Sequence, residues 1–117
     1  MLVTLLKSKI HRLTVTETNI NYTGSITIDS KLLKKANILP FEQVHVVNVT
    51  NGQRLITYVI EGNPGSGEVC LNGAAARLAE PGDIVIVISY GQYNEKEIKT
   101  YKPKVIQVDS NNKQKNK

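Results

Sequence analysis

Alternation of apolar and polar residues is the first pattern in the chain, and it predicts β-strands. Residues 10–16 alternate and β-branched residues dominate 25–28, and both features are typical of strands with one buried face. Residues 43–49 and 55–60 flank the segment 50–53, whose Asn-Gly pair would supply two positive-φ positions. These two runs therefore predict a tight β-hairpin.

Two further strands are predicted nearer the C-terminus. Residues 83–90 contain consecutive aliphatic side chains, which predicts a central strand buried on both faces. Residues 105–108 would form a closing edge strand. About six or seven short strands indicate a mainly β domain whose sheet closes, or nearly closes, into a barrel, because closure removes exposed strand edges.

Two short helical segments interrupt the predicted strands. Capping residues followed by helix formers predict a helix over 29–36, which Pro40 would stop. A second helical turn is predicted over 72–79, ending before Pro81-Gly82. The fold expected from the pattern is thus a β-barrel with short helices.

Length and charge limit the functions that such a barrel could have. A chain of 117 residues forms one domain, assigned here to residues 1–109, and excludes a two-domain enzyme. The net charge of +5 favours nucleic-acid binding, but three of the lysines lie in the polar tail 110–117. The rest of the chain is nearly neutral, and the tail is predicted to be disordered because it has no apolar residue.

The few cysteine and histidine residues exclude other classes of site. Cys70 is the only cysteine and cannot form an intramolecular disulfide, and with only two histidines the chain offers no zinc site, so no metal is expected. The longest aliphatic run, 84–88, is too short to cross a membrane. We therefore expect a cytoplasmic protein without a membrane partner.

Gly24 and Ser25 form the one local pattern that suggests chemistry of another kind. Glycine adopts strained backbone dihedrals, which could bring the Ser25 hydroxyl onto the Gly24 carbonyl at the entrance of a strand. Gly-Ser is also a common turn element, and on local grounds a turn is the simpler interpretation.

Several short segments together resemble the aspartate 1-decarboxylase family, which depends on a pyruvoyl group. They occur in order from about Lys9 to Tyr101: Lys9-Ile10-His11-Arg12, Tyr22-Thr23-Gly24-Ser25, Asn48-Val49-Thr50-Asn51-Gly52-Gln53-Arg54, Thr57-Tyr58, Asn72-Gly73-Ala74-Ala75-Ala76 and Gly82-Asp83-Ile84-Val85. The resemblance implies a double-psi β-barrel that assembles as a homotetramer with active sites between subunits. It also implies decarboxylation of L-aspartate to β-alanine for pantothenate synthesis.

The same resemblance implies that the chain cuts itself between Gly24 and Ser25. The Ser25 hydroxyl would attack the Gly24 carbonyl, and elimination with loss of ammonia would turn Ser25 into the pyruvoyl cofactor. Thr57 would stabilise the oxyanion that develops during this shift. Considered without the family, Thr57 is an ordinary strand residue.

Substrate contacts follow from the resemblance as well. Arg54 would hold a substrate carboxylate through paired hydrogen bonds, and Lys9 would add charge at the other end. Tyr58 would donate a proton during turnover, and His11 would be a positioning group. On composition alone, Arg54 and Lys9 would be surface charges and Tyr58 a core residue.

Four consecutive residues complete the implied site. Asn72 would offer its amide, while Gly73, Ala74 and Ala75 would offer backbone donors and allow close approach. A plain helix start explains the same residues. His45 and Cys70 match no functional position and are assigned to the scaffold.

Three alternatives stay open at this point. Val47 replaces an aromatic residue of some family members, which could change substrate preference, for example toward glutamate. A non-catalytic barrel that binds nucleic acid is the rival from another class, although only 5% of the residues are aromatic. Self-cleavage could be spontaneous or could need a maturation factor.

Overall fold

Eight β-strands and three short helical segments make up the computed structural model, which describes residues 1–115. The strands are β1 (Val3–Thr14), β2 (Glu17–Asn19), β3 (Ser25–Asp29), β4 (Gln43–Asn48), β5 (Arg54–Gly62), β6 (Val69–Asn72), β7 (Ile84–Tyr93) and β8 (Lys104–Gln107). The helices are α1 (Ser30–Ala36), the 3₁₀ segment η1 (Gly73–Leu78) and α2 (Glu95–Ile98). The prediction of a mainly β fold with short helices is confirmed.

The sheet curls so that its two ends approach each other. Its strand order is β2-β6-β3-β5-β4-β7-β1-β8, so the consecutive strands β1 and β2 stand near opposite ends. Thr16, between these strands, donates its backbone N–H to the carbonyl of Val69 at 2.8 Å. Three parallel pairs, β1 with β8, β2 with β6 and β3 with β5, require crossing connections, which agrees with the double-psi barrel that the resemblance implies.

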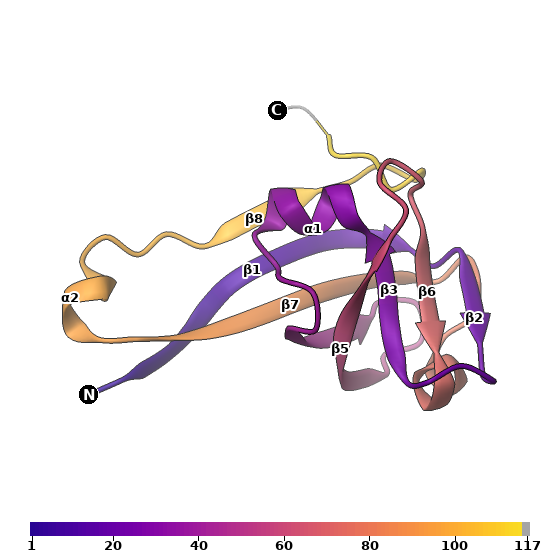
Figure 1. The fold of residues 1–117 in the computed structure, drawn as a ribbon, viewed down its shortest axis with the longest axis horizontal. Coiled ribbons are helices and arrows are strands. Elements are labelled where there is room, and N and C mark those ends of the chain that lie inside the picture. Colours follow the sequence, from indigo (N-terminus) through magenta and orange to yellow (C-terminus); the bar gives the residue numbers. More distant parts are fainter. Residues whose placement is uncertain (116–117) are drawn as a thin grey trace.

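A two-stranded arm projects from this barrel. The first half of β1 and the last half of β7 pair from Val3 with Tyr93 onward and reach away from the other strands, with α2 at the tip (Figure 1). Leu2 and Tyr90 on this arm are 60% and 44% exposed. Apolar side chains are therefore left uncovered along the arm in a single chain.

The core is formed by the inward residues of the strands together with α1. Alternate positions of β4 and β7, namely Val44, Val46, Val85 and Val87, are almost completely buried. They pack in one cluster with residues of other elements, including Ile10, Leu13, Ile26, Ile28, Leu33, Val59 and Leu71. Truncating one of the large aliphatic residues to alanine would cost about 2–5 kcal/mol of unfolding free energy.

β7 departs from its prediction on one face. It is a central strand between β4 and β1, as expected, but Ile84, Ile86 and Ile88 are only partly buried. The prediction of burial on both faces is therefore wrong for the single chain. The aliphatic run reflects an outer sheet face that is half covered.

Turn and helix ends also differ in detail from the predictions. The hairpin of β4 and β5 forms as predicted. Of the Asn51-Gly52 pair, only Gly52 has a positive φ, +78°. The Asn51 side chain instead accepts a hydrogen bond from the Gln53 backbone N–H. Helix α1 is capped by Asp29 as expected, and it ends at Asn37 in the left-handed conformation, before Pro40 is reached.

Within residues 1–115, no helix has the length and apolar character needed to cross a bilayer.

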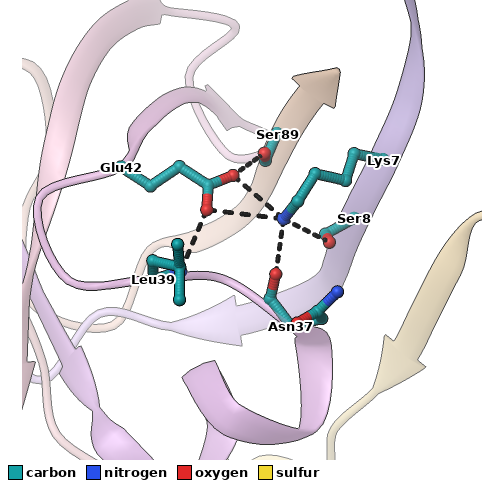
Figure 2. A network of polar contacts seen from close by, with 6 residues as sticks. All are labelled: Lys7, Ser8, Asn37, Leu39, Glu42 and Ser89. Carbon is teal, nitrogen blue, oxygen red and sulfur yellow. Dashed lines mark hydrogen bonds and ion pairs between the residues drawn. The ribbon is translucent and has the colours of Figure 1, made fainter. Parts of the chain in front are cut away.

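A polar network fastens β1 to the loop after α1 and to β7. Lys7 Nζ forms an ion pair with Glu42 at 3.0 Å and also donates to the carbonyl of Asn37 (Figure 2). Glu42 accepts from the Leu39 backbone N–H at 2.9 Å and from the Ser89 hydroxyl. Burial alone would raise the pKa of Glu42, but these donors and Lys7 outweigh it and hold the pKa below its usual range.

The C-terminal segment is more ordered than its composition predicts. Asn112 is 1% exposed, and its side chain donates to the carbonyls of Thr14 and Gly67, each at 2.8 Å. The Thr14 N–H donates in turn to Asn112 Oδ1 at 2.8 Å. Residues 110–115 therefore differ from the predicted disorder because one amide satisfies three backbone groups, and residues 116–117 lie outside the described residues.

Candidate active site

Ser25 is buried at the first position of β3 and is held by the neighbouring strand. It pairs with Asn72 of β6, whose Nδ2 donates to Ser25 Oγ at 2.9 Å and to Thr27 Oγ1 at 3.0 Å. The Ser25 hydroxyl donates to the carbonyl of Thr23 at 3.3 Å. The nucleophile expected from the sequence thus accepts one hydrogen bond and donates another.

Asn72 occupies the cap position of η1 without acting as a cap. Its side chain makes no capping hydrogen bond to the helix, and both protons of its amide go to Ser25 and Thr27. The plain helix start weighed from the sequence therefore does not account for this side chain. Its amide belongs to the surroundings of Ser25.

Gly73, not Gly24, has the backbone conformation that requires glycine. Its φ is +64°, and a Cβ there would lie 2.6 Å from Gly24 N and 2.8 Å from the carbonyl oxygen of Tyr22. Gly24 is not among the positive-φ glycines, so the left-handed conformation that glycine permits occurs at Gly73 and not at Gly24. Close approach of two segments at Gly73 is what positions Gly24.

One cavity brings together four of the predicted residues. Its volume is about 240 Å³, and Gly24, Thr57, Ala74 and Ala75 line it together with Leu55, Ile56 and Leu78. Thr57 lies on β5 between the inward residues Leu55 and Val59, so it faces the barrel side of that strand. Thr57 and the Gly24 peptide therefore share one cavity.

Tyr58 and Arg54 lie on the opposite face of β5. Side chains alternate along a strand, so these even-numbered residues point away from Thr57. Tyr58 packs against Phe41 with ring centroids 6.3 Å apart, and Arg54 is exposed. Neither residue lines the cavity that contains Gly24.

Lys9 shares this outer face. The strand register places Ile56, His45, Ile88 and Lys9 in one row across β5, β4, β7 and β1. Paired residues of adjacent strands point to the same side of a sheet. The outer sheet face is defined by Arg54, Tyr58, Lys9 and the isoleucines Ile56 and Ile88 between them. Within one chain it meets the Gly24 cavity at Ile56, whereas Arg54, Tyr58 and Lys9 do not line that cavity.

His11 lies at a bulge of β1 on the same side as Lys9. The pairing of β1 with β7 shifts between Ile10 and Leu13, and Arg12 has a φ of +69° there. Burial lowers the pKa of His11, and the charges of Lys9 and Arg12 lower it further. His11 is therefore neutral at neutral pH, and its buried Nδ1 has no hydrogen-bond partner among residues 1–115.

Cys70 is a contact of the site that the sequence did not reveal. Its Sγ lies 3.2 Å from Asn72 Oδ1, in a position to donate. The available signal was its spacing, because residues two apart on a strand share a face. His45, also assigned to the scaffold, makes an edge contact with Tyr90 at 5.1 Å on the outer sheet face.

The residues around Ser25 fit a prosthetic group made from the chain itself. Ser25 is fully buried, directly follows the Gly24 peptide, and has an amide donor in hydrogen-bond contact. A buried carbonyl formed at this position would keep Asn72 as a donor within reach of residue 25. Among residues 1–115, no cluster of His, Cys, Asp or Glu side chains is arranged to hold a metal ion.

These features define a mainly β protein with a buried, hydrogen-bonded serine directly after a glycine at a strand entrance. Within that class, the family model described as Aspartate decarboxylase matches residues 1–115, and the chain belongs to this family. The resemblance inferred from the sequence is confirmed.

Relatives named aspartate 1-decarboxylase align over nearly the whole chain. That of Pelotomaculum thermopropionicum is 61% identical, over 97% of this chain and 86% of its own length. Those of Acetivibrio thermocellus and Listeria monocytogenes are 58% and 54% identical, over 97% and 96% of this chain and 90% and 88% of their own lengths. Among solved structures, the computationally designed protein msDPBB_sym2 aligns with a TM-score of 0.46 and 15% identity, covering 74% of this chain and 99% of that one.

Proposed function

We propose that this protein decarboxylates L-aspartate at C1 to give β-alanine and carbon dioxide, after cutting itself between Gly24 and Ser25. The observation that carries the proposal is the hydrogen bond from Asn72 to the buried Ser25 hydroxyl, beside the Gly24 peptide and within a chain of the aspartate decarboxylase family. The β-alanine would serve pantothenate synthesis. The cytoplasm is the proposed compartment, in keeping with the single unpaired cysteine.

Self-cleavage would proceed as a shift of the Gly24 acyl group from nitrogen to oxygen. Ser25 Oγ bonds to the Gly24 carbonyl carbon while the peptide C–N bond breaks, and the Ser25 proton ends on the released amine. Elimination then removes the Cα proton of residue 25 and breaks its Cβ–Oγ bond, which leaves a carboxylate on Gly24 and a dehydroalanine at residue 25. The dehydroalanine becomes an imine when a proton moves from its amine to Cβ. One water molecule hydrolyses the resulting imine and releases ammonia, which completes the pyruvoyl group on residue 25.

Thr57 and Asn72 have separate tasks in this step. Thr57 shares a cavity with Gly24, so its hydroxyl would stabilise the oxygen anion that forms on the Gly24 carbonyl. Asn72 holds Ser25 Oγ in place through its amide. Gly73, Ala74 and Ala75 keep the surroundings small enough for the two segments to touch.

The pyruvoyl group, once formed, supplies a carbonyl that accepts the electrons released when the substrate carboxylate leaves. The chain's own residues do the rest. Arg54 would hold a substrate carboxylate with paired hydrogen bonds, and Lys9 would add positive charge. Tyr58 would deliver a proton from its phenol, and neutral His11 would position neighbouring groups.

A homotetramer with sites between subunits would unite these two sets of residues. Within one chain, Arg54 and Lys9 of the outer sheet face do not line the cavity that contains Gly24, although Ile56 of the same face does. Ile56 on that face is 58% exposed, and apolar surface of this kind is typical of subunit contacts. A second copy that packs on this face would cover the isoleucines and bring Arg54 to the neighbour's cavity. Maturation could still need a helper protein.

Purified protein incubated with L-aspartate tests the proposed activity. β-Alanine and carbon dioxide should form in equal amounts, and Ser25→Ala should abolish both because no pyruvoyl group can form. Glutamate should be turned over much more slowly; comparable rates would reassign the substrate and implicate Val47, which pairs with Arg54. If Ser25→Ala turns over aspartate as fast as the parent, the proposed mechanism is wrong.

A further inference from the structure

Two side-chain hydrogen bonds in sequence lead from Cys70 through Asn72 to the Ser25 hydroxyl. The Cys70 thiol lies 3.2 Å from Asn72 Oδ1, and the other end of the same amide donates to Ser25 Oγ at 2.9 Å. Thr27 Oγ1 accepts the second amide proton at 3.0 Å. Both protons of the amide are therefore donated, and its oxygen, which can accept two hydrogen bonds, accepts one within residues 1–115, from Cys70.

The direction of the amide decides what the serine hydroxyl can do. An asparagine side chain turned by half a rotation exchanges its NH₂ group for its oxygen. In that orientation Asn72 would accept a proton from Ser25, and this proton would no longer be donated to Thr23. As observed, Ser25 Oγ accepts from Asn72 and keeps its own proton directed at the Thr23 carbonyl, 3.3 Å away.

The thiol disfavours the turned orientation because it is a donor and only a weak acceptor. Burial raises the pKa of the Cys70 thiol, and the carboxylates of Glu17 and Glu68 raise it further. Both carboxylates line a cavity of about 340 Å³ together with Cys70 and Asn72. The thiol therefore keeps its proton at neutral pH and donates to Asn72.

We propose that Cys70 is a positioning residue for self-cleavage, because its thiol fixes the Asn72 amide with the NH₂ group toward Ser25 Oγ. This inference rests on the proposed function, since it concerns the conversion of Ser25. Cys70 acts only through Asn72 and has no part in binding the substrate. Its contribution is to the rate at which the precursor matures.

Cys70→Ala and Cys70→Ser separate the hydrogen bond from the packing. Alanine removes the donor, whereas serine keeps one at the same position. Precursor cleavage is followed by intact mass at intervals after cell-free synthesis, and melting temperatures report whether each variant is folded. We expect cleavage to slow about three- to tenfold in Cys70→Ala and to stay within about twofold of the parent in Cys70→Ser.

Two results would overturn the inference. One is equal cleavage of the parent and Cys70→Ala. The other is equally slow cleavage of both variants while they are folded, since it would mean that packing and not the donor matters. Failure of the parent itself to cleave would count against the proposed function and not against this contact.

Hydrogen exchange of the Asn72 side-chain amide, measured by NMR on the uncleaved chain, gives a readout independent of cleavage. The amide protons should exchange several-fold faster in Cys70→Ala than in the parent and Cys70→Ser, because the unanchored amide rotates more freely. Equal exchange in all three chains would contradict the positioning role even if the precursor never matures.

Discussion

The surroundings of Ser25 and the outer sheet face both contain residues of the family motifs. They differ in how many of the groups needed for their proposed tasks a single chain brings together. Around Ser25, one chain supplies the nucleophile, its amide partner and the glycine contact, and the groups are buried and hydrogen-bonded. On the outer sheet face, Arg54 and Ile56 are exposed and Ile88 is half-buried. Under the proposed function, one chain would organise maturation, whereas turnover would call for a second copy.

The largest expected effect concerns the contact that shapes the Ser25 region. In Gly73→Ala, a methyl group would lie 2.6 Å from Gly24 N, and backbone atoms must move to admit it. We expect cleavage to fall at least about tenfold, because reacting groups need near-attack geometry. Intact mass after timed incubation measures it.

Gly52→Ala is the matched control for Gly73→Ala. Gly52 also has positive φ, +78°, but no atom lies within 4 Å of the added Cβ. It should cost about 1 kcal/mol of unfolding free energy and leave cleavage unchanged. Normal cleavage in Gly73→Ala would show that the close approach to Gly24 is not required.

Mixing two inactive variants tests the division between the regions. Under the proposed roles, Ser25→Ala would lack the prosthetic group and Arg54→Ala would lack the substrate clamp, so each alone should lose most of its activity. Chains refolded together should regain activity, because some sites combine an intact Ser25 of one copy with an intact Arg54 of another. Activity that stays at the level of the separate variants would place both residues of a site in one chain.

Tyr58→Phe should affect only turnover, the proposed task of the outer sheet face. Cleavage should proceed as in the parent because Tyr58 faces away from Thr57, while kcat should fall about 10²-fold or more if the phenol is the proton donor. Stopped assays of β-alanine give kcat, and intact mass gives the extent of cleavage. Parental kcat would remove Tyr58 from the acid role.

A smaller effect is expected at the polar network in Figure 2, which serves neither region directly. Glu42→Gln replaces the carboxylate that accepts from Lys7, Leu39 and Ser89, and should cost about 1–3 kcal/mol of unfolding free energy. Cleavage should be unaffected. Urea unfolding at neutral pH measures the difference.

The same carboxylate predicts how stability varies with pH. The folded pKa of Glu42 is depressed, so its stabilising contribution is complete above the unfolded pKa and is lost as pH falls through the folded value. Asp29 behaves alike: burial alone would raise its pKa, but the backbone N–H groups of Gly67, Gly65 and Lys31 outweigh that and lower it. The parent should therefore lose stability below about pH 4, and Glu42→Gln should lose less over that range.

Local patterns in the sequence predicted most strands and both principal helical segments. Alternation and capping identified β3, α1 and the hairpin of β4 with β5, because these signals depend on neighbouring residues. The alternation of side chains along β5 also predicts that Thr57 lies on the opposite face of the strand from Tyr58 and Arg54. Local patterns do not predict contacts between residues far apart in the chain. Lys7 and Glu42 are 35 positions apart, and Asn72 and Ser25 are 47 positions apart. Only the family resemblance indicated the contact of Asn72 with Ser25.

The intact mass of freshly purified, denatured protein tests the central claim most directly. The account predicts two chains, residues 1–24 and 25–117, with the larger one lighter by one ammonia molecule than hydrolysis alone would leave it. A single uncut mass that persists after prolonged warm incubation, also in the presence of extract from the source cells, would contradict conversion of Ser25 to a pyruvoyl group.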